Sequence, residues 1–205
     1  MTPRLLQVDG LGWCDQAERL PSPNCDARPD GMPSDLLVIH NISLPPRQFG
    51  GRYIADLFAN RLDYTADPYF DALRGLRVSA HFLIRRDGHL MQFVSTFQRA
   101  WHAGVSQFEE RERCNDFSIG IELEGSDFDP FTDPQYERLV GLTMALQQMH
   151  ALRAVCGHDY IAPGRKTDPG PFFDWHRYQS QWTSASAADA PKAGTAAPLR
   201  FAATI

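Results

Sequence analysis

The chain has no long uninterrupted apolar segment. Nothing in its 205 residues approaches the run of about 20 apolar residues that a membrane-spanning helix needs. The N-terminal stretch from Met1 to Asp9 meets charged side chains within a few positions and lacks the continuous apolar core of a signal peptide. From these absences we expect neither a membrane anchor nor export, and the sequence predicts a cytoplasmic protein.

Concentrations of positive charge are also missing. Lys and Arg number 20 against 25 Asp and Glu, which gives a formal net charge of −5, and no run rich in Lys or Arg occurs. Such a chain lacks the positively charged surface that attracts nucleic acid or anionic lipid. It is therefore predicted to bind neither nucleic acid nor a membrane.

Cysteine is scarce and scattered. The chain contains no Cys-x-x-Cys pair, the spacing typical of structural zinc sites and redox disulfides. The four cysteines are Cys14, Cys25, Cys114 and Cys156. In a reducing cytoplasm we expect them to be free thiols, mostly buried and without chemistry.

We expect one domain with irregular ends. Residues 1–35 are rich in Pro, Asn, Asp and Ser, which is typical of an irregular arm that wraps a domain. From about Thr183 the chain turns to Ser, Ala, Pro and Thr with little to bury. The sequence thus predicts a domain over residues 1–182, arm included, and a low-complexity C-terminal tail over residues 183–205.

Several segments between these ends have the patterns of strands. The apolar run that begins at Leu36 and closes with His40 predicts one strand, where the sheet is expected to start. Asp87-Gly88 between two apolar runs predicts a tight hairpin. Strict alternation over residues 118–124 predicts a third strand, with Glu122 and Glu124 together on an open face.

Helical patterns lie between the strands. One begins near Ile54, and a stronger one follows Thr132, which with Gln135 has the form of a capping box. A brief strand over residues 153–157 and a short aromatic helix over residues 172–178 complete the order. The pattern predicts a mixed α/β (α+β) fold with a mixed central β-sheet flanked by helices.

Two histidines and one aspartate are candidates for a metal site. His40 ends a strand, where sheets commonly open onto a ligand, while His158 and Asp168 bracket a loop rich in Gly and Pro. Two imidazoles and a carboxylate can hold Zn²⁺ and leave its fourth position for water. A metal ion with one bound water is the smallest set of groups that a metal hydrolase needs.

Two more charged residues could serve the same centre. Pro169 favours extended backbone at Asp168, so Lys166 and Asp168 project to the same side. Lys166 could then stabilise an oxyanion, and Glu122 could act as a general base. The alternative is that Glu122 solvates an exposed strand and that Lys166 forms a surface ion pair with Asp168. Spacing alone does not decide between these alternatives.

Five ordered motifs, spread over most of the segment from Trp13 to about Tyr178, resemble the AmpD family. They run from Leu37 to Pro46, Arg77 to Gly88, Ala100 to Gly104, Arg111 to Gly125 and Gly164 to Pro171. The members of this family are cytoplasmic 1,6-anhydro-N-acetylmuramyl-L-alanine amidases of Gram-negative bacteria.

The resemblance implies a zinc amidase with the fold of phage T7 lysozyme and peptidoglycan recognition proteins. The family's zinc ligands correspond to His40, His158 and Asp168, and its catalytic residues to Glu122 and Lys166. The bond cut would be the amide between the lactyl group of anhydro-muramic acid and L-alanine of the stem peptide, during cell-wall recycling. The implied partner is a small soluble anhydro-muropeptide, and the implied state is a monomer.

The resemblance also implies contacts with the substrate. The corresponding positions are Asn41, Tyr69, Arg77, Trp101 and Arg113. Their side chains suit amide recognition, carboxylate pairing and stacking on a sugar ring. For Tyr69 an aromatic at the edge of the core is an alternative.

Two further histidines are not assigned to the metal. His81 lies within a strand-like segment and is expected to be structural. His102 follows Trp101 and could line the cleft, but its spacing does not make it a ligand.

Two other functions remain as alternatives. Peptidoglycan-recognition relatives bind muropeptides without cleaving them, and such binders typically lack one zinc ligand, whereas all three candidates are present here. Two histidines and a carboxylate can also form the facial triad of a non-haem iron oxygenase. That triad would leave Glu122 and Lys166 without a purpose.

Overall fold

One seven-stranded sheet forms the centre of the computed structural model, which describes residues 5–189 and 198–202. Across the sheet the strands are β1 (Glu18–Arg19), β5 (Leu90–Gln92), β4 (Phe82–Ile84), β9 (Ser118–Glu124), β3 (Leu36–Ile42), β10 (Ala154–Gly157) and β11 (Arg200–Ala202). Neighbouring strands are parallel except for β4 and β5, which form the predicted hairpin. The prediction of a mixed sheet is confirmed.

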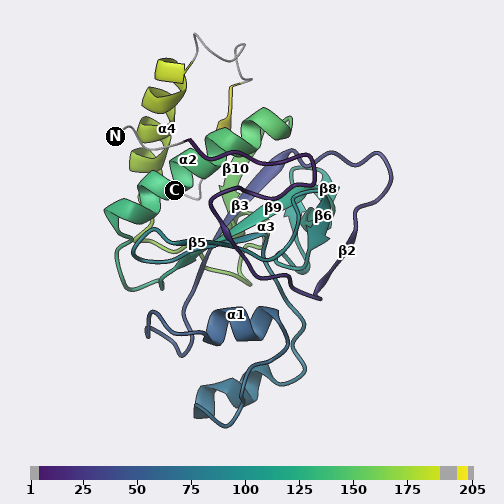
Figure 1. Cartoon of the computed structure of the whole chain (residues 1–205), viewed down its shortest axis with the longest axis vertical. Helices are drawn as coiled ribbons and strands as arrows, with labels where there is room; N and C mark the ends of the chain where they lie inside the picture. Colours follow the sequence, from purple (N-terminus) through teal and green to yellow (C-terminus); the bar gives the residue numbers. More distant parts are fainter. Residues whose placement is uncertain (1–4, 190–197, 203–205) are drawn as a thin grey trace.

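Helices lie on both sides of this sheet. They are α1 (Tyr53–Phe58), α2 (Asp133–Met149), α3 (His158–Ile161) and α4 (Trp175–Asp189), with 3-10 turns at Pro68–Leu73 and Cys114–Asp116. Figure 1 shows α2 and α4 together on one side, with α1 on the opposite side. Two small ribbons, β2 (Cys25–Ala27) with β6 (Gln98–Ala100) and β7 (Gln107–Phe108) with β8 (Arg111–Glu112), complete the fold. Across the described ranges, no helix combines the length and apolar character needed to cross a membrane.

The two faces of β3 and β9 differ in what they bury. On one face, Ile39 and Ile121 join the core cluster that also contains Leu139, Leu142 and Leu146 of α2. Side chains alternate along a strand, so His40 lies on the same face as Val38, which packs in a separate cluster with Phe108 and Cys114. His40 therefore points away from α2, and the opposite face of the sheet is where a site can form.

The predicted open face of β9 is closed. Every residue of this strand is buried, and Glu124 is only 2% exposed. Its carboxylate accepts hydrogen bonds from the backbone N–H of Gly50 at 2.6 Å and of Arg86 at 3.2 Å, with the Arg85 guanidinium 3.5 Å away. Glu124 thus stabilises two loops, and the prediction that it shares a solvent-exposed face with Glu122 is wrong.

The capping box of α2 is confirmed and does more than cap the helix. Thr132 and Gln135 exchange the two hydrogen bonds that define the motif. The fully buried Gln135 amide also donates to the carbonyl oxygens of Ile84 at 3.2 Å and Glu124 at 2.9 Å. The start of α2 is thereby attached to both β4 and β9.

Both ends of the chain contain regular secondary structure that their composition does not predict. β1 of the N-terminal arm extends the sheet, so the sheet does not start at Leu36. The structure also differs from the predicted tail, because α4 continues to Asp189 and β11 pairs with β10. Phe201 packs on Tyr178 and Trp182, with ring centroids 5.2 and 5.6 Å apart. This one aromatic residue holds β11 against α4, and the average composition of the segment does not reveal it. The remaining parts of the arm and tail, 1–4, 190–197 and 203–205, lie outside the described residues.

We predict that Gln135→Ala lowers the free energy of unfolding by about 2–3 kcal/mol, because the substitution removes the buried donor to two carbonyl groups and half of a capping box. Urea unfolding followed by circular dichroism measures this change. Glu137→Ala, at an exposed position on the same helix, is the control and should stay within about 0.5 kcal/mol of the parent chain. Equal losses in the two variants would contradict this role of Gln135.

Candidate metal centre

His40 and His158 are brought together by two parallel strands. In the pairing of β3 with β10, Ile39 lies opposite Gly157. The residues that follow them, His40 and His158, therefore lie side by side. β3 continues to Ile42, past its predicted end at His40, and His158 begins α3. Both imidazoles are buried, and burial lowers the pKa of His40 to about 4, so this ring is neutral near pH 7.

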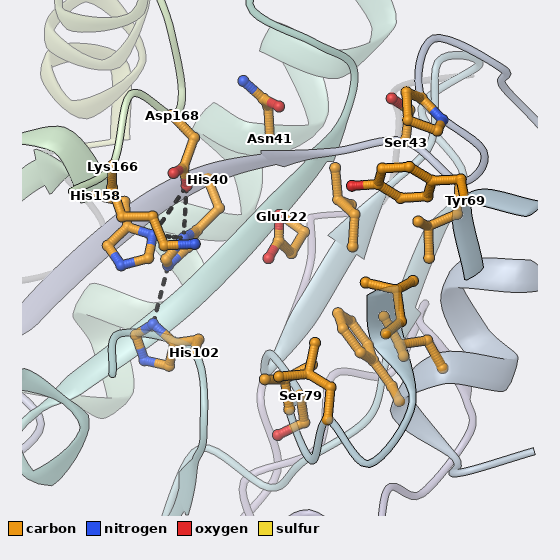
Figure 2. Close-up of a pocket in the computed structure, with 18 residues that line it drawn as sticks. His40, Asn41, Ser43, Tyr69, Ser79, His102, Glu122, His158, Lys166 and Asp168 are labelled. Atoms are coloured by element: carbon orange, nitrogen blue, oxygen red, sulfur yellow. Dashed lines mark hydrogen bonds and ion pairs between the residues drawn. The ribbon is translucent and has the colours of Figure 1, made fainter. Parts of the chain in front are cut away.

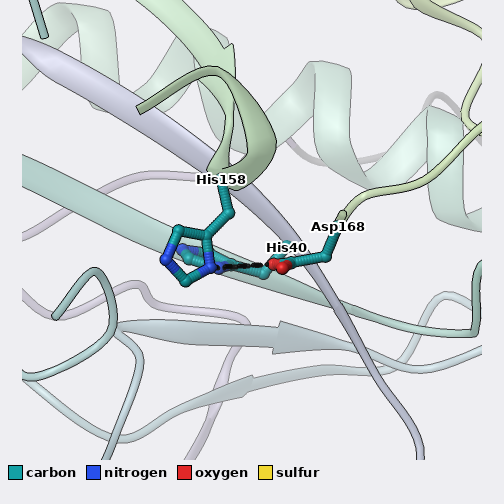
Figure 3. A group of neighbouring side chains, drawn as sticks. All are labelled: His40, His158 and Asp168. Atoms are coloured by element: carbon teal, nitrogen blue, oxygen red, sulfur yellow. Dashed lines mark hydrogen bonds and ion pairs between the residues drawn. The ribbon is translucent and has the colours of Figure 1, made fainter. Parts of the chain in front are cut away.

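Asp168 reaches the same point from the loop after α3. Its Oδ2 lies 2.9 Å from Nδ1 of His40 and 3.1 Å from Nδ1 of His158, and the two nitrogens are 3.0 Å apart. Figure 3 shows the three side chains converging. Ligand atoms about 2 Å from a tetrahedral metal are about 3.3 Å from one another, close to these separations. The three residues could therefore hold a metal ion.

The hydrogen bonds around His158 test whether a cation fits here. Its Nε2 lies 3.1 Å from the carbonyl oxygen of Ala103, which can only accept, so Nε2 carries the proton. When this ring is neutral, Nδ1 presents a lone pair. That lone pair faces the carboxylate of Asp168, an arrangement that is repulsive unless a cation lies between them. The donor set thus fits a bound divalent metal.

The loop that contains Asp168 is held by a carboxylate. Asp127, just beyond the end of β9, accepts from Nδ2 of Asn41 at 2.7 Å and from the hydroxyl of Thr167 at 2.5 Å. Asn41 also donates to the carbonyl oxygen of Pro169 at 3.1 Å. Both amide protons of Asn41 are therefore used internally, and its carbonyl oxygen is the atom left for a ligand. Asp127 was not predicted as a site residue from the sequence, although polar residues just after the ends of parallel strands commonly gather at one sheet edge.

Glu122 and Lys166 face the same pocket. Glu122 is the register partner of His40 across β3 and β9, and its Oε2 has no hydrogen-bond partner in the described parts of the chain. Burial raises the pKa of Glu122 well above its usual value. Lys166 is exposed and lines the pocket on the side of Asp168, as Figure 2 shows. The Asp168 carboxylate contacts the imidazoles of His40 and His158, at 2.9 and 3.1 Å from their Nδ1 atoms.

The pocket measures about 330 Å³ and has two unlike halves. The metal-binding candidates and Glu122 form a polar half. Beyond them the walls are apolar and come from α1 and the loops around it, with Leu44, Leu57, Phe58, Leu73 and Val78 among the lining residues. The arrangement places the candidate metal ligands and a potential base, Glu122, beside an apolar surface.

The structure brings only part of the expected substrate contacts to this pocket. Asn41 and Tyr69 line it, and Tyr69 is 45% exposed, which favours a cleft position over a core edge. The Trp101 indole N–H donates to Asp26 at 3.3 Å, Arg77 is exposed, and neither lines this pocket. Arg113 pairs with Asp116 at 3.2 Å and lines a separate groove of about 520 Å³.

The two unassigned histidines differ in position. His81 is fully buried, and its Nδ1 accepts the backbone N–H of Gly120 at 3.0 Å, consistent with a structural role. His102 lines the pocket and reaches Nε2 of His40 with its Nδ1 at 2.9 Å, as Figure 2 shows. His102 therefore contacts the Nε2 atom of His40, on the side of the ring opposite to the candidate metal position.

The chain resembles known amidases in sequence and in structure. Residues 30–171 match the family described as N-acetylmuramoyl-L-alanine amidase. The 1,6-anhydro-N-acetylmuramyl-L-alanine amidase AmpD of Citrobacter freundii is 55% identical over 177 residues, which cover 85% of this chain and 95% of that protein. A crystal structure of an AmpD derivative matches with a TM-score of 0.80 at 54% identity, over 84% of this chain and 97% of the other.

More distant structures share the architecture. AmiD from Escherichia coli, in complex with the substrate anhydro-N-acetylmuramic acid-L-Ala-D-gamma-Glu-L-Lys, matches at 26% identity with a TM-score of 0.54, over 85% of this chain and 65% of the other. The Drosophila protein PGRP-LB, at 17% identity and a TM-score of 0.50 over 78% of this chain and 86% of the other, shows the fold alone. The predicted relation to the fold of peptidoglycan recognition proteins is thus confirmed.

Fold and pocket define a hydrolase with a potential metal centre. The chain belongs to the N-acetylmuramoyl-L-alanine amidase family, and its close relatives in that family are AmpD proteins. The resemblance predicted from the motifs is confirmed.

We predict that a divalent metal such as Zn²⁺ raises the melting temperature of the metal-free protein, because an ion that binds only the folded state stabilises it by mass action. In Asp168→Ala this increase should be largely lost, since one of three ligands and its negative charge are removed. Differential scanning calorimetry with and without zinc measures both. An Asp168→Ala variant that keeps the full shift would refute the metal site described above.

Proposed function

We propose that this chain hydrolyses the amide bond between the lactyl group of 1,6-anhydro-N-acetylmuramic acid and the L-alanine of the stem peptide. The observation that carries the proposal is that the His40, His158 and Asp168 cluster lines one pocket with Glu122, whose Oε2 has no hydrogen-bond partner among the described residues. The name of the Citrobacter relative supports the anhydro sugar as the substrate, and the AmiD complex supports a stem peptide attached to it.

Zinc is the proposed cofactor, held by Nδ1 of His40, Nδ1 of His158 and Oδ2 of Asp168. A donor set of two imidazoles and one carboxylate is common in catalytic zinc sites, which keep one position open. When bound, zinc lowers the pKa of a water molecule and polarises the scissile carbonyl. Burial lowers the pKa of His40 to about 4, which suits this role because imidazole binds a metal only in its unprotonated form.

Glu122 is the proposed general base. It enters the pocket from β9 beside His40, and it has a free carboxylate oxygen to accept the proton of the attacking water. Its buried position raises its proton affinity relative to an exposed carboxylate. A carboxylate that takes a proton readily can return it to the departing amine of L-alanine.

Lys166 is the proposed oxyanion stabiliser. It lines the pocket from the loop that also provides Asp168, and its ammonium is free to follow the substrate because the side chain is exposed. A cation next to the developing negative charge on the carbonyl oxygen stabilises the transition state more than the ground state. The reaction therefore has a proton acceptor on one side and a cation on the other.

Substrate contacts follow from the two halves of the pocket. The carbonyl oxygen of Asn41 is free to accept a hydrogen bond from the substrate, and Tyr69 can stack on a sugar ring at the apolar half. Arg113 lies in the neighbouring groove, where a guanidinium suits a carboxylate of the stem peptide. Contacts by Arg77 and Trp101 would require side-chain movement toward the bound ligand.

The proposed setting is cell-wall recycling in the cytoplasm, with the protein acting as a monomer on small soluble anhydro-muropeptides. A pocket of about 330 Å³ with one polar and one apolar half suits one sugar and the first peptide residues. The names of the AmpD relatives support this substrate class.

We predict that Glu122→Gln lowers kcat by about 10²–10⁴, because the variant retains the shape of the side chain but loses the proton acceptor. Metal analysis should find the same zinc content as in the parent protein, since Glu122 is not a ligand in this account. Glu110→Gln, an exposed change on the turn between β7 and β8, is the control and should leave kcat unaltered. An unchanged rate in Glu122→Gln would assign the base to another group.

The reaction itself is tested with two substrates. Incubation with anhydro-muramyl-peptide should release the intact stem peptide and anhydro-muramic acid, identified by mass, and removal of zinc by a chelator should stop the release. Incubation with the non-anhydro muramyl-peptide measures how strongly the anhydro ring is preferred. If both compounds bound tightly and neither was cleaved, the assignment as an amidase would be wrong and the protein would be a muropeptide-binding protein.

A further inference from the structure

His102 occupies a position behind the metal-binding edge of His40. Its Nδ1 lies 2.9 Å from Nε2 of His40, and the two rings meet edge to face at 88°. Nδ1 of His40 faces away from this contact, toward Asp168 and His158. The two nitrogens of His40 thus have separate tasks, one toward His102 and one toward the metal position.

The direction of this hydrogen bond follows from the chain of donors behind His102. The hydroxyl of Ser118 donates its only proton to the carbonyl oxygen of Cys114 at 2.5 Å. Its oxygen must therefore accept from Nε2 of His102, 3.1 Å away. A neutral His102 with its proton on Nε2 has a lone pair on Nδ1, so the proton of the next contact comes from Nε2 of His40.

This series of hydrogen bonds fixes one tautomer of His40. With its proton on Nε2, its lone pair is on Nδ1 and points at the position between Asp168 and His158. The other tautomer would place an N–H there and could not bind a metal.

The backbone beside His102 orients the second imidazole in the same way. Oδ1 of Asn115 accepts the backbone N–H groups of His102 at 3.1 Å and Ala103 at 2.8 Å. The carbonyl oxygen of Ala103 then accepts the Nε2 proton of His158 at 3.1 Å. One dipeptide, fixed by one asparagine, faces the outer nitrogens of both imidazoles.

The sheet provides room for this arrangement. The His102 ring lies over Gly120 in the middle of β9, and a Cβ at that position would come within 2.5 Å of its Cγ. β9 therefore has no side chain between Ser118 and Glu122 on this face, and His102 fills the space. A larger residue at Gly120 would displace the ring from its contact with His40.

We propose that His102 is a positioning residue that holds His40 in the tautomer and orientation required for binding zinc. The proposal rests on the zinc site given under the proposed function and adds a residue to it that does not touch the metal. Partners of this kind orient ligands and raise their basicity, and their loss typically costs about 10- to 100-fold in metal affinity.

The test measures the dissociation constant of zinc by competition with a chromophoric chelator, in the absence of substrate. His102→Phe retains a ring of similar size but has no acceptor, and its zinc affinity should fall by about 10- to 100-fold. His102→Asn places an amide group near the position of Nδ1 and should recover most of the loss. His89→Phe, at an exposed histidine on the β4–β5 hairpin, is the matched control and should bind zinc like the parent protein.

A second readout reports the tautomer directly. Two-bond ¹⁵N–¹H couplings of the His40 ring should show the proton on Nε2 in the parent protein and a mixture of tautomers in metal-free His102→Phe. Should that variant fail to fold, Ser118→Ala tests the same chain and should weaken zinc binding in the same direction. Parent-like zinc affinity in folded His102→Phe or Ser118→Ala, with an unchanged tautomer, would overturn the proposal and leave the amidase assignment standing. A parent protein that binds no zinc would instead refute the metal site on which the proposal depends.

Discussion

The parallel pairing of β3 with its two neighbours is the constraint on which the site depends. Its register with β10 places His40 beside His158, and its register with β9 places Glu122 opposite His40. A shift by one residue in either ladder would turn these side chains to the face covered by α2. The apolar residues on that face therefore hold the polar residues of the other face in place, so core packing and site geometry are specified together.

Burial then gives the site its chemistry. The same neighbouring strands and loops that exclude water from His40 keep the ring neutral. They also leave Oε2 of Glu122 without a hydrogen-bond partner in the part of the chain that the structure describes. Uncompensated polar groups of this kind cost stability unless a ligand satisfies them. In this structure they converge on one pocket, where a cation and a substrate amide would supply the missing partners.

Elements with strong local patterns could be predicted from the sequence. Alternation located β9, Asp87-Gly88 located the hairpin, and the capping box located the start of α2, because each pattern acts through near neighbours. Burial of Glu124 could not be predicted, since it depends on loops around Gly50 and Arg86 that close over the strand. The packing of Phe201 on α4 has the same cause, a contact between segments far apart in the chain.

The candidate site divides along the same line. The residue types of the metal cluster were visible in the motifs, but the distances among them arise from strand register. Asn41 and Asp127 show the limit most clearly, because the amide expected to contact substrate donates one proton to Asp127 and the other to the carbonyl oxygen of Pro169, next to Asp168. Hydrogen-bond directions of this kind, including the chain from Cys114 to His40, exist only in the folded arrangement.

The most direct test of the account is a crystal structure of the zinc-loaded protein with anomalous diffraction data collected at the zinc absorption edge. We predict one anomalous peak about 2 Å from Nδ1 of His40, Nδ1 of His158 and a carboxylate oxygen of Asp168, with a fourth position open to the pocket. Coordination of His40 through Nε2, direct coordination by His102, or a peak outside this pocket would contradict it.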